Sequence, residues 1–203
     1  QAKVNMREPS LNSVGAGDKV FIILCLGIVC PRKNQIWTVE LFKQFAMNKI
    51  NVRLVIVGAR RTRLYEVEYL EKLKLAIGND PQIELHDVTD NVDTFFSQAH
   101  CLMITSLNEV TPMVVSEAMS WSLPVLSTNI AGIKEMYTDG VEGFLFAPDD
   151  SEKALHGLNA LYESKELMTK MATAARSRYE KVFDLNLMVE SYQRLVMKVA
   201  PLV

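Results

Sequence analysis

The chain has 203 residues, of which 49% are hydrophobic and 23% are charged, and its formal net charge is -2. This composition suits one globular domain with a sizeable core, and the charge balance gives no reason to expect a nucleic-acid partner. Three cysteines form no disulfide framework and favour a reducing compartment, and no apolar run approaches the ~20 residues that a membrane-spanning helix needs.

The first part of the chain, residues 1–19, is polar and has no sustained hydrophobic period, so we interpret it as a linker or a fraying terminus. Its run Gly15-Ala16-Gly17 precedes a strand instead of following one, and therefore fails the context test for a dinucleotide-binding turn. Because the chain begins with Gln1, we expect an excised domain or a processed product.

From residue 20 onward, short apolar runs alternate with amphipathic segments. Such runs, rich in branched residues, are typical of strands buried on both faces of a parallel sheet. Strands are expected at 20–27, 52–57, 83–86, 101–105, 124–128 and 143–146. Helices are expected at 35–47, 64–77, 91–99, after residue 111, and at 131–137, 152–163, 165–181 and 185–199. The alternation predicts an α/β fold, a Rossmann-like doubly wound parallel sheet of about six strands with a helical C-terminal tail.

The helix after residue 111 has an unusual start. Thr111 is expected to cap it, Pro112 suits its first turn, and the carboxylates of Glu109 and Glu117 stand on either side of that start. A helix N-terminus carries unpaired N–H groups and partial positive charge, so it favours a phosphate. The flanking carboxylates can accept hydrogen bonds from hydroxyls. A ligand with phosphate in its middle and hydroxyl-bearing rings at both ends, such as a nucleotide sugar, would fit.

The carboxyl ends of the predicted strands give independent support, because ligands of open parallel sheets bind in the crevice outside those ends. The residues that follow the strands include Glu109 and two basic clusters, Arg32-Lys33 and Arg60-Arg61-Thr62-Arg63. Topology alone therefore brings Glu109 and both clusters to one edge of the sheet.

A family resemblance rests on these same residues. Glu109 and Glu117 with seven residues between them, followed by Ala118-Met119, Pro124-Val125 and Gly132-Ile133-Lys134-Glu135, resemble the signature of family-4 retaining glycosyltransferases. These enzymes have two facing Rossmann-like domains (the GT-B architecture), and the signature lies in their C-terminal, donor-binding domain. The resemblance covers residues 21–199. It implies a Rossmann-like nucleotide-sugar-binding domain at 20–183, and a C-terminal helix at 184–203 that in the family packs against the N-terminal domain, missing here.

The resemblance also implies roles for individual residues. Lys33 and Arg32 would be catalytic by stabilising the diphosphate leaving group, and Glu109 would lie beside the donor sugar. The family usually has arginine directly after the glycine that ends the first strand, where this chain has Ile28, so the role of Arg32 stays open. Glu117 would accept hydrogen bonds from the ribose hydroxyls. Further donor contacts are expected, largely from the backbone, at Gly27, Gly58, His86, Val88, Thr111, Met113 and Val114.

Each assignment has a structural alternative. Arg32, Lys33 and the arginines of the second cluster could be solvated loop charges, and Glu117 a surface glutamate. His86 and Val88 could belong to an ordinary strand end with a helix-capping loop. The whole chain could be a non-catalytic nucleotide-binding or interaction module. A dehydrogenase is disfavoured because the Gly-rich turn is missing.

The expected ligand is a nucleoside diphosphate sugar of the UDP or GDP type, with no cofactor and no metal ion, since His86, His100 and His156 lack metal-ligand spacing. Because the acceptor would be held by the missing domain, we expect the isolated chain to bind donor and to transfer sugar poorly. We expect a cytoplasmic location or the cytosolic face of a membrane. A homodimer through the C-terminal helix, and membrane contact through the absent half, both stay open.

Overall fold

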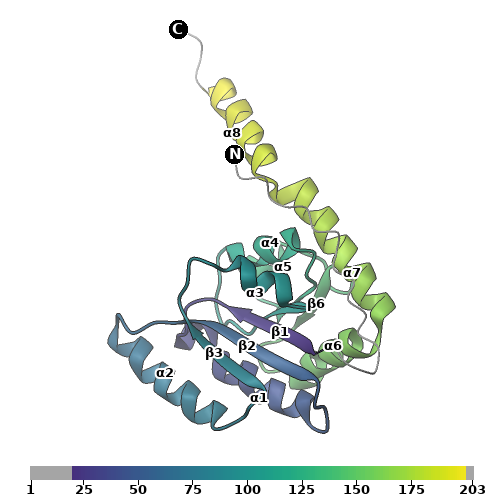
Figure 1. Cartoon of the computed structure of the whole chain (residues 1–203). Helices are drawn as coiled ribbons and strands as arrows, with labels where there is room; N and C mark the ends of the chain where they lie inside the picture. The colour runs from purple at the N-terminus through teal and green to yellow at the C-terminus, as the bar shows by residue number, and fades with distance from the viewer. Residues whose placement is uncertain (1–19, 200–203) are drawn as a thin grey trace.

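The computed structural model of the chain describes residues 20–199 (Figure 1). The predicted linker, residues 1–19, lies outside the described residues. The described part contains one six-stranded sheet in the order β3-β2-β1-β4-β5-β6, and all five strand pairings are parallel. The strands are β1 (Phe21–Leu26), β2 (Val52–Ala59), β3 (Ile83–Asp87), β4 (Cys101–Ile104), β5 (Val125–Thr128) and β6 (Gly143–Phe146). The predicted Rossmann-like α/β fold is confirmed.

Helices cover both faces of this sheet and form two hydrophobic cores (Figure 1). One core packs the sheet against α1 (Gln35–Ala46), α2 (Leu64–Ile77) and α6 (Ser151–Glu163). The other packs it against α3 (Asp93–Gln98), α4 (Met113–Ser120) and α5 (Ala131–Lys134). Because both faces are covered, the central strands are apolar on both sides, which explains why they appear in the sequence as unbroken apolar runs.

The strand order reverses direction between β1 and β4. From β1 the chain builds outward through β2 and β3, then crosses back to β4 and builds the other way through β5 and β6. The loops that follow β1 and β4 therefore diverge from neighbouring strand ends, and such a switch point is where doubly wound sheets bind ligands. These two loops are called the cation loop (residues 28–34) and the carboxylate loop (residues 105–112) below.

Two local predictions at this edge were wrong. Thr111 is not the N-cap of α4: Pro112 is, with backbone angles of -73° and 106°, so it lies outside the helix, and its side chain makes no capping hydrogen bond. Gly58 does not end the second strand, because β2 continues to Ala59 with a register shift against β3 between Val57 and Ala59.

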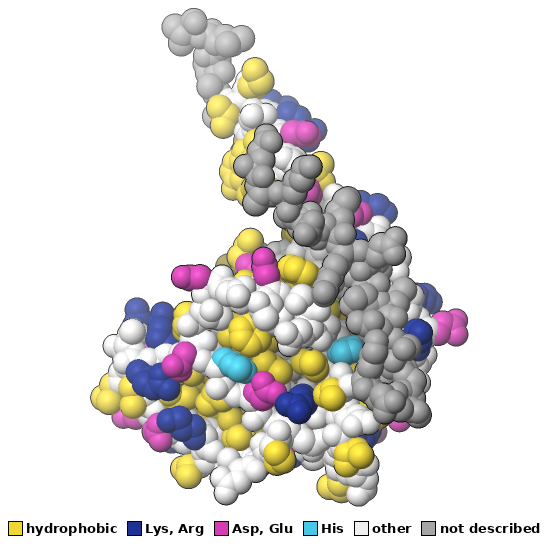
Figure 2. Space-filling view, in the orientation of Figure 1, with side chains coloured by type: hydrophobic (Ala, Val, Ile, Leu, Met, Phe, Trp, Pro, Cys, Tyr) yellow, Lys and Arg dark blue, Asp and Glu magenta, His cyan; other side chains and the backbone are white. Residues whose placement is uncertain are grey.

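The C-terminal part is helical, as expected. Helix α7 (Lys165–Arg178) ends three residues before the predicted end at residue 181 and continues into a π-helical turn (Tyr179–Phe183). Helix α8 (Leu185–Val199) follows. Helix α8 projects from the rest of the described chain (Figure 1), and Figure 2 shows hydrophobic atoms exposed along it. The exposed apolar side chains are Leu185, Met188, Val189, Tyr192, Leu195, Val196 and Met197. Packing of this helix on another domain stays a prediction. None of the helices within residues 20–199 is long and apolar enough to cross a bilayer.

Candidate functional site

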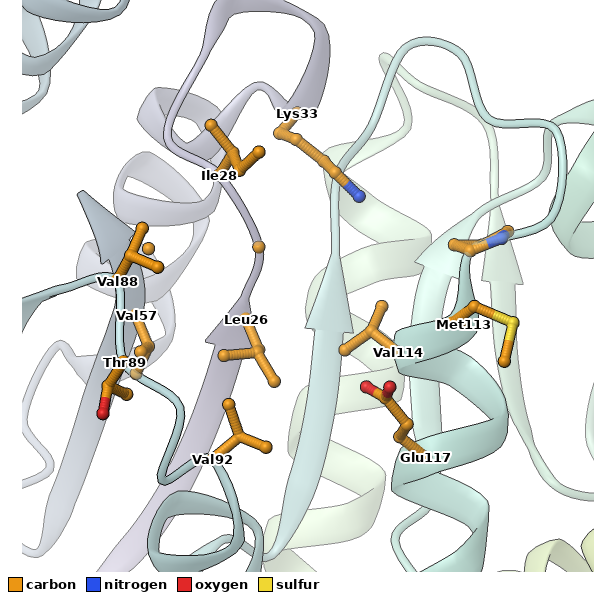
Figure 3. Close-up of a pocket in the computed structure, with 13 residues that line it drawn as sticks. Leu26, Ile28, Lys33, Val57, Val88, Thr89, Val92, Met113, Val114 and Glu117 are labelled. Atoms are coloured by element: carbon orange, nitrogen blue, oxygen red, sulfur yellow. The ribbon is translucent and has the colours of Figure 1, made fainter. Parts of the chain in front are cut away.

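A cleft of about 290 Å³ lies at the carboxyl edge of the sheet, between the ends of β1 and β2 and the start of α4 (Figure 3). Its lining is mostly apolar, and the exceptions are Lys33, Thr89, Glu117 and two glycines. The apolar lining residues are Leu26, Ile28, Val57, Val88, Val92, Pro112, Met113 and Val114. An apolar wall with a few converging polar groups is the usual composition of a small-molecule site.

Seven of the predicted site residues line this cleft: Gly27, Lys33, Gly58, Val88, Met113, Val114 and Glu117. The other four, Arg32, His86, Glu109 and Thr111, do not line it. Thr111 is exposed on the carboxylate loop. His86 lies on the edge strand β3, where it contacts Glu84 of the same strand and the ring of Phe95 on α3. The sequence predicts the carboxyl edge of the sheet for all of them, and their roles in binding stay predictions.

The two glycines bring β1 and β2 close together where the cleft begins. A Cβ atom on Gly58 would lie 2.1 Å from the carbonyl oxygen of Gly27, so no other residue fits there without a shift of the backbone. Gly27 has a φ of 144°, and a Cβ atom on it would lie 3.5 Å from Nζ of Lys33. The Lys33 side chain therefore lies across Gly27, with its ammonium at the mouth of the cleft (Figure 3).

Lys33 reaches this position from a short 3-10 turn, Pro31–Lys33, in the cation loop. The turn ends at Asn34, which has a left-handed φ of 54° and is also the N-cap of α1. The amide of Gln35 spans the loop, because its nitrogen donates to the carbonyl of Ile28 at 3.0 Å and its oxygen accepts from the N–H of Cys30 at 3.4 Å. The buried Gln35 was not singled out from the sequence, where a glutamine at a helix start is unremarkable.

Glu109 lies beside the cleft mouth and pairs with both predicted cations. Its carboxylate is 2.6 Å from Nζ of Lys33 and 2.8 Å from a guanidinium nitrogen of Arg32, and Ser106 donates to it at 2.9 Å. Burial acts to raise the pKa of Glu109, but Lys33, Arg32 and Ser106 outweigh it and hold that pKa below its usual range. Glu109 is therefore ionised at neutral pH and neutralises part of the positive charge around it.

Glu117 is different, since it lies on the first turns of α4 and opens to the cleft (Figure 3). Desolvation by the cleft wall raises the pKa of Glu117, and the negative charge of Asp93 raises it further. Among residues 20–199, no ion pair involves Glu117. Its carboxylate lies near a helix start whose first N–H groups have no partner within the helix, and it can accept hydrogen bonds from a ligand.

The second basic cluster is largely engaged with the protein itself. Arg60 pairs with the buried carboxylate of Glu66, and Arg61 pairs with Asp87 at 2.9 Å. Arg63 donates to the hydroxyl of Tyr65 at 3.1 Å. These contacts favour a structural role for the cluster over steering of a ligand.

The family of this chain follows from its match to a protein-family model. The model of the glycosyl transferases group 1 family matches residues 6–178, most of the chain. This chain belongs to that family. The expected resemblance to the C-terminal domain of a GT-B glycosyltransferase is thereby confirmed at the level of family and fold.

Curated relatives agree with the family assignment. An uncharacterized glycosyltransferase of Haemophilus influenzae is 24% identical over 175 residues, covering 86% of this chain and 48% of the relative. The lipopolysaccharide 1,2-N-acetylglucosaminetransferase of Salmonella typhimurium is 27% identical over 173 residues, covering 81% of this chain and 45% of the relative. The chain thus spans about half the length of the curated relatives it matches.

Among solved structures, HepE of Anabaena in complex with UDP and glucose superposes with a TM-score of 0.80 at 20% identity, covering 89% of this chain and 49% of that one. The C-terminal domain of the group 1 glycosyltransferase LpcC from Francisella tularensis gives a TM-score of 0.71 at 20% identity, covering 81% of this chain and 87% of that domain. At these identities the likeness establishes the fold.

Proposed function

We propose that this group 1 glycosyltransferase chain is a donor-binding domain that holds a nucleoside diphosphate sugar in the cleft between β1 and α4. The observation that carries the proposal is the arrangement of Lys33 and Glu117 on opposite sides of one cleft at the switch point of the sheet. The solved neighbour HepE, described in complex with UDP and glucose, supports a uridine nucleotide as the first ligand to test.

In the proposed complex, the diphosphate lies between the ammonium of Lys33 and the first N–H groups of α4, at Met113 and Val114. Both features favour negative charge, one as a full cation and the other through the helix dipole. The ribose hydroxyls donate to Glu117, and the base lies against the apolar wall near Ile28 and Val88. No cofactor and no metal ion is needed for this mode of binding.

The proposed reaction is glycosyl transfer with retention of configuration. The bond between the anomeric carbon and the β-phosphate oxygen breaks, and the acceptor hydroxyl attacks from the same face, passing its proton to the departing phosphate. Lys33, with Arg32, stabilises the charge that develops on the leaving oxygen, where a cation lowers the barrier most. Glu109 lies beside the sugar and accepts hydrogen bonds from its hydroxyls.

The acceptor is proposed to bind a second domain, because the chain spans about half of its curated relatives. We therefore expect the chain on its own to bind the donor and to transfer sugar at most slowly. Robust transfer by this chain alone would contradict that part of the proposal.

Calorimetric titration with UDP, GDP and ADP tests the binding proposal. We expect saturable binding of at least one of them, and a loss of about 2–3 kcal/mol, or roughly 30- to 150-fold, for Glu117→Ala, because hydrogen bonds to a charged acceptor are removed. Glu68→Ala, an exposed glutamate on α2, is the matched control and is expected to bind as the unaltered chain does. An unchanged nucleotide affinity in Glu117→Ala would contradict the proposed binding site.

A further inference from the structure

A buried hydroxyl pair lies directly beneath Lys33 and joins the cation loop to the carboxylate loop. Thr105 follows β4 with a side chain that is 1% exposed, and Thr38 on α1 is fully buried. Their hydroxyl oxygens are 2.7 Å apart. The Thr105 hydroxyl also lies 2.9 Å from the carbonyl oxygen of Asn34 and 3.2 Å from that of Lys33.

The direction of these hydrogen bonds follows from donor counting. Carbonyl oxygens can only accept, so the single proton of the Thr105 hydroxyl points to Asn34 and Lys33. Thr38 then donates to Thr105, and all three contacts are hydrogen bonds. Buried polar groups are costly unless they are paired. The hydroxyl pair therefore favours the loop conformation in which these hydrogen bonds form, and does more than fill space in the core.

The backbone that Thr105 holds is that of Lys33 itself, so it sets the direction of the Lys33 side chain. The N–H of Lys33 donates to the carbonyl of Cys30 at 3.0 Å, and its carbonyl is held by Thr105, so both sides of the residue are fixed. Asn34 has the left-handed conformation in which the loop turns into α1. A second link, from the N–H of Leu107 to the carbonyl of Arg32 at 2.8 Å, joins the same two loops but does not involve Lys33 itself.

We propose that Thr105, supported by Thr38, is a positioning residue that sets the ammonium of Lys33 across Gly27 for contact with a donor diphosphate. This inference rests on the proposed function, since it needs Lys33 to bind phosphate. Thr105 does not line the cleft. Its effect on binding must therefore pass through Lys33.

A double-mutant cycle measures that coupling. Thr105→Val keeps the shape of the side chain and removes the hydroxyl, and we expect it to weaken UDP binding about fivefold, the effect of one lost hydrogen bond. Thr105→Ser, which restores the hydroxyl, is expected to bind within about twofold of the unaltered chain. In a Lys33→Ala background, Thr105→Val is expected to have no further effect, because the group that it positions is gone.

Two results would overturn the inference. One is an unchanged UDP affinity in Thr105→Val. The other is the same fold loss of affinity with and without Lys33, which is the result expected of a purely structural role.

If Thr105→Val does not fold, Thr38→Val replaces it. That variant leaves Thr105 bonded to the carbonyls, so we expect a smaller loss of UDP affinity, which again vanishes in the Lys33→Ala background. An unchanged UDP affinity in Thr38→Val would contradict the inference. If UDP fails to bind the unaltered chain, the proposed function fails instead, so the two failures are distinguishable.

Discussion

The carboxylate of Glu109 and the ammonium of Lys33 form an ion pair of 2.6 Å at the mouth of the cleft, and the Glu109 side chain is only 7% exposed. Arg32 pairs with the other oxygen of the same carboxylate. The two cations that the proposal assigns to the diphosphate are therefore already partly neutralised by a protein anion. A bound diphosphate would have to compete with Glu109 for them.

This competition predicts that Glu109→Gln binds UDP more tightly than the unaltered chain. Removing the negative charge frees Lys33 and Arg32 for the phosphates, and a gain of about fivefold, or about 1 kcal/mol, is expected from one ion pair near the surface. UDP lacks the sugar, so the loss of contacts between Glu109 and sugar hydroxyls does not obscure the effect.

The check is a UDP titration of Glu109→Gln beside Glu68→Gln, the exposed control on α2. Equal or weaker binding by Glu109→Gln would show that Glu109 organises the two cations instead of competing for them. Lower ionic strength should enlarge the difference, since the contacts are electrostatic.

The raised pKa of Glu117 predicts a pH dependence of nucleotide affinity. The ionised carboxylate accepts the ribose hydrogen bonds, so binding strengthens as the pH rises through the pKa of Glu117 and then levels off. The phosphates of UDP titrate as well. The quantity to measure is therefore the ratio of the affinities of the unaltered chain and Glu117→Gln from about pH 4 to about pH 8. A ratio that does not change with pH would contradict the assignment of Glu117.

Ile28 offers a gain-of-function test. It lines the cleft and is 37% exposed, at the place directly after Gly27 where the resembled family usually has arginine. Ile28→Arg adds a cation that can reach a diphosphate, and we expect UDP to bind about three- to tenfold more tightly through a charge-assisted contact. Ile28→Gln, which adds length without charge, is the matched control. A gain shared by both variants would point to packing instead of charge.

Glu66 predicts an effect on stability away from the cleft. Its buried carboxylate accepts from Arg60, from the hydroxyl of Thr62 at 2.8 Å and from the N–H of Arg63 at 3.2 Å. The hydrogen bond from Arg60 contributes most to lowering the pKa of Glu66 to about 2 from a usual value of 4.5. A carboxyl group with a depressed pKa stabilises the folded chain at pH values above its usual pKa of 4.5. This stability is lost as the pH falls from 4.5 towards 2.

Urea unfolding at several pH values measures this contribution. Glu66→Gln is expected to lower the unfolding midpoint at pH 7 and to reduce the loss of stability on acidification, whereas Glu68→Gln on the same helix should do neither. An unchanged midpoint at pH 7 would show that the buried ion pair adds no net stability.

The sequence was sufficient for the fold and for the edge of the sheet that carries the cleft. Apolar runs such as Phe21–Leu26 are buried on both faces because helices cover both, so they could be recognised without long-range information. Lys33, Met113 and Glu117 follow strands or begin helices at one edge, and parallel topology alone brings them together.

What the sequence could not predict depends on how separate loops meet. The pairing of Glu109 with Lys33 requires β1 and β4 to be neighbours, and no local pattern encodes that. The expected cap at Thr111 failed because the extended backbone of Pro112 places the helix start one residue later. The hydroxyl of Thr105 looked like the polar end of an apolar run, and only its contacts reveal that it holds the neighbouring loop.

A crystal structure of the chain with UDP bound tests the central claim most directly. The account predicts the diphosphate between Lys33 and the first residues of α4, with the ribose hydroxyls within hydrogen-bond distance of Glu117. A nucleotide bound elsewhere, with Glu117 facing solvent and Lys33 still paired with Glu109, would contradict it.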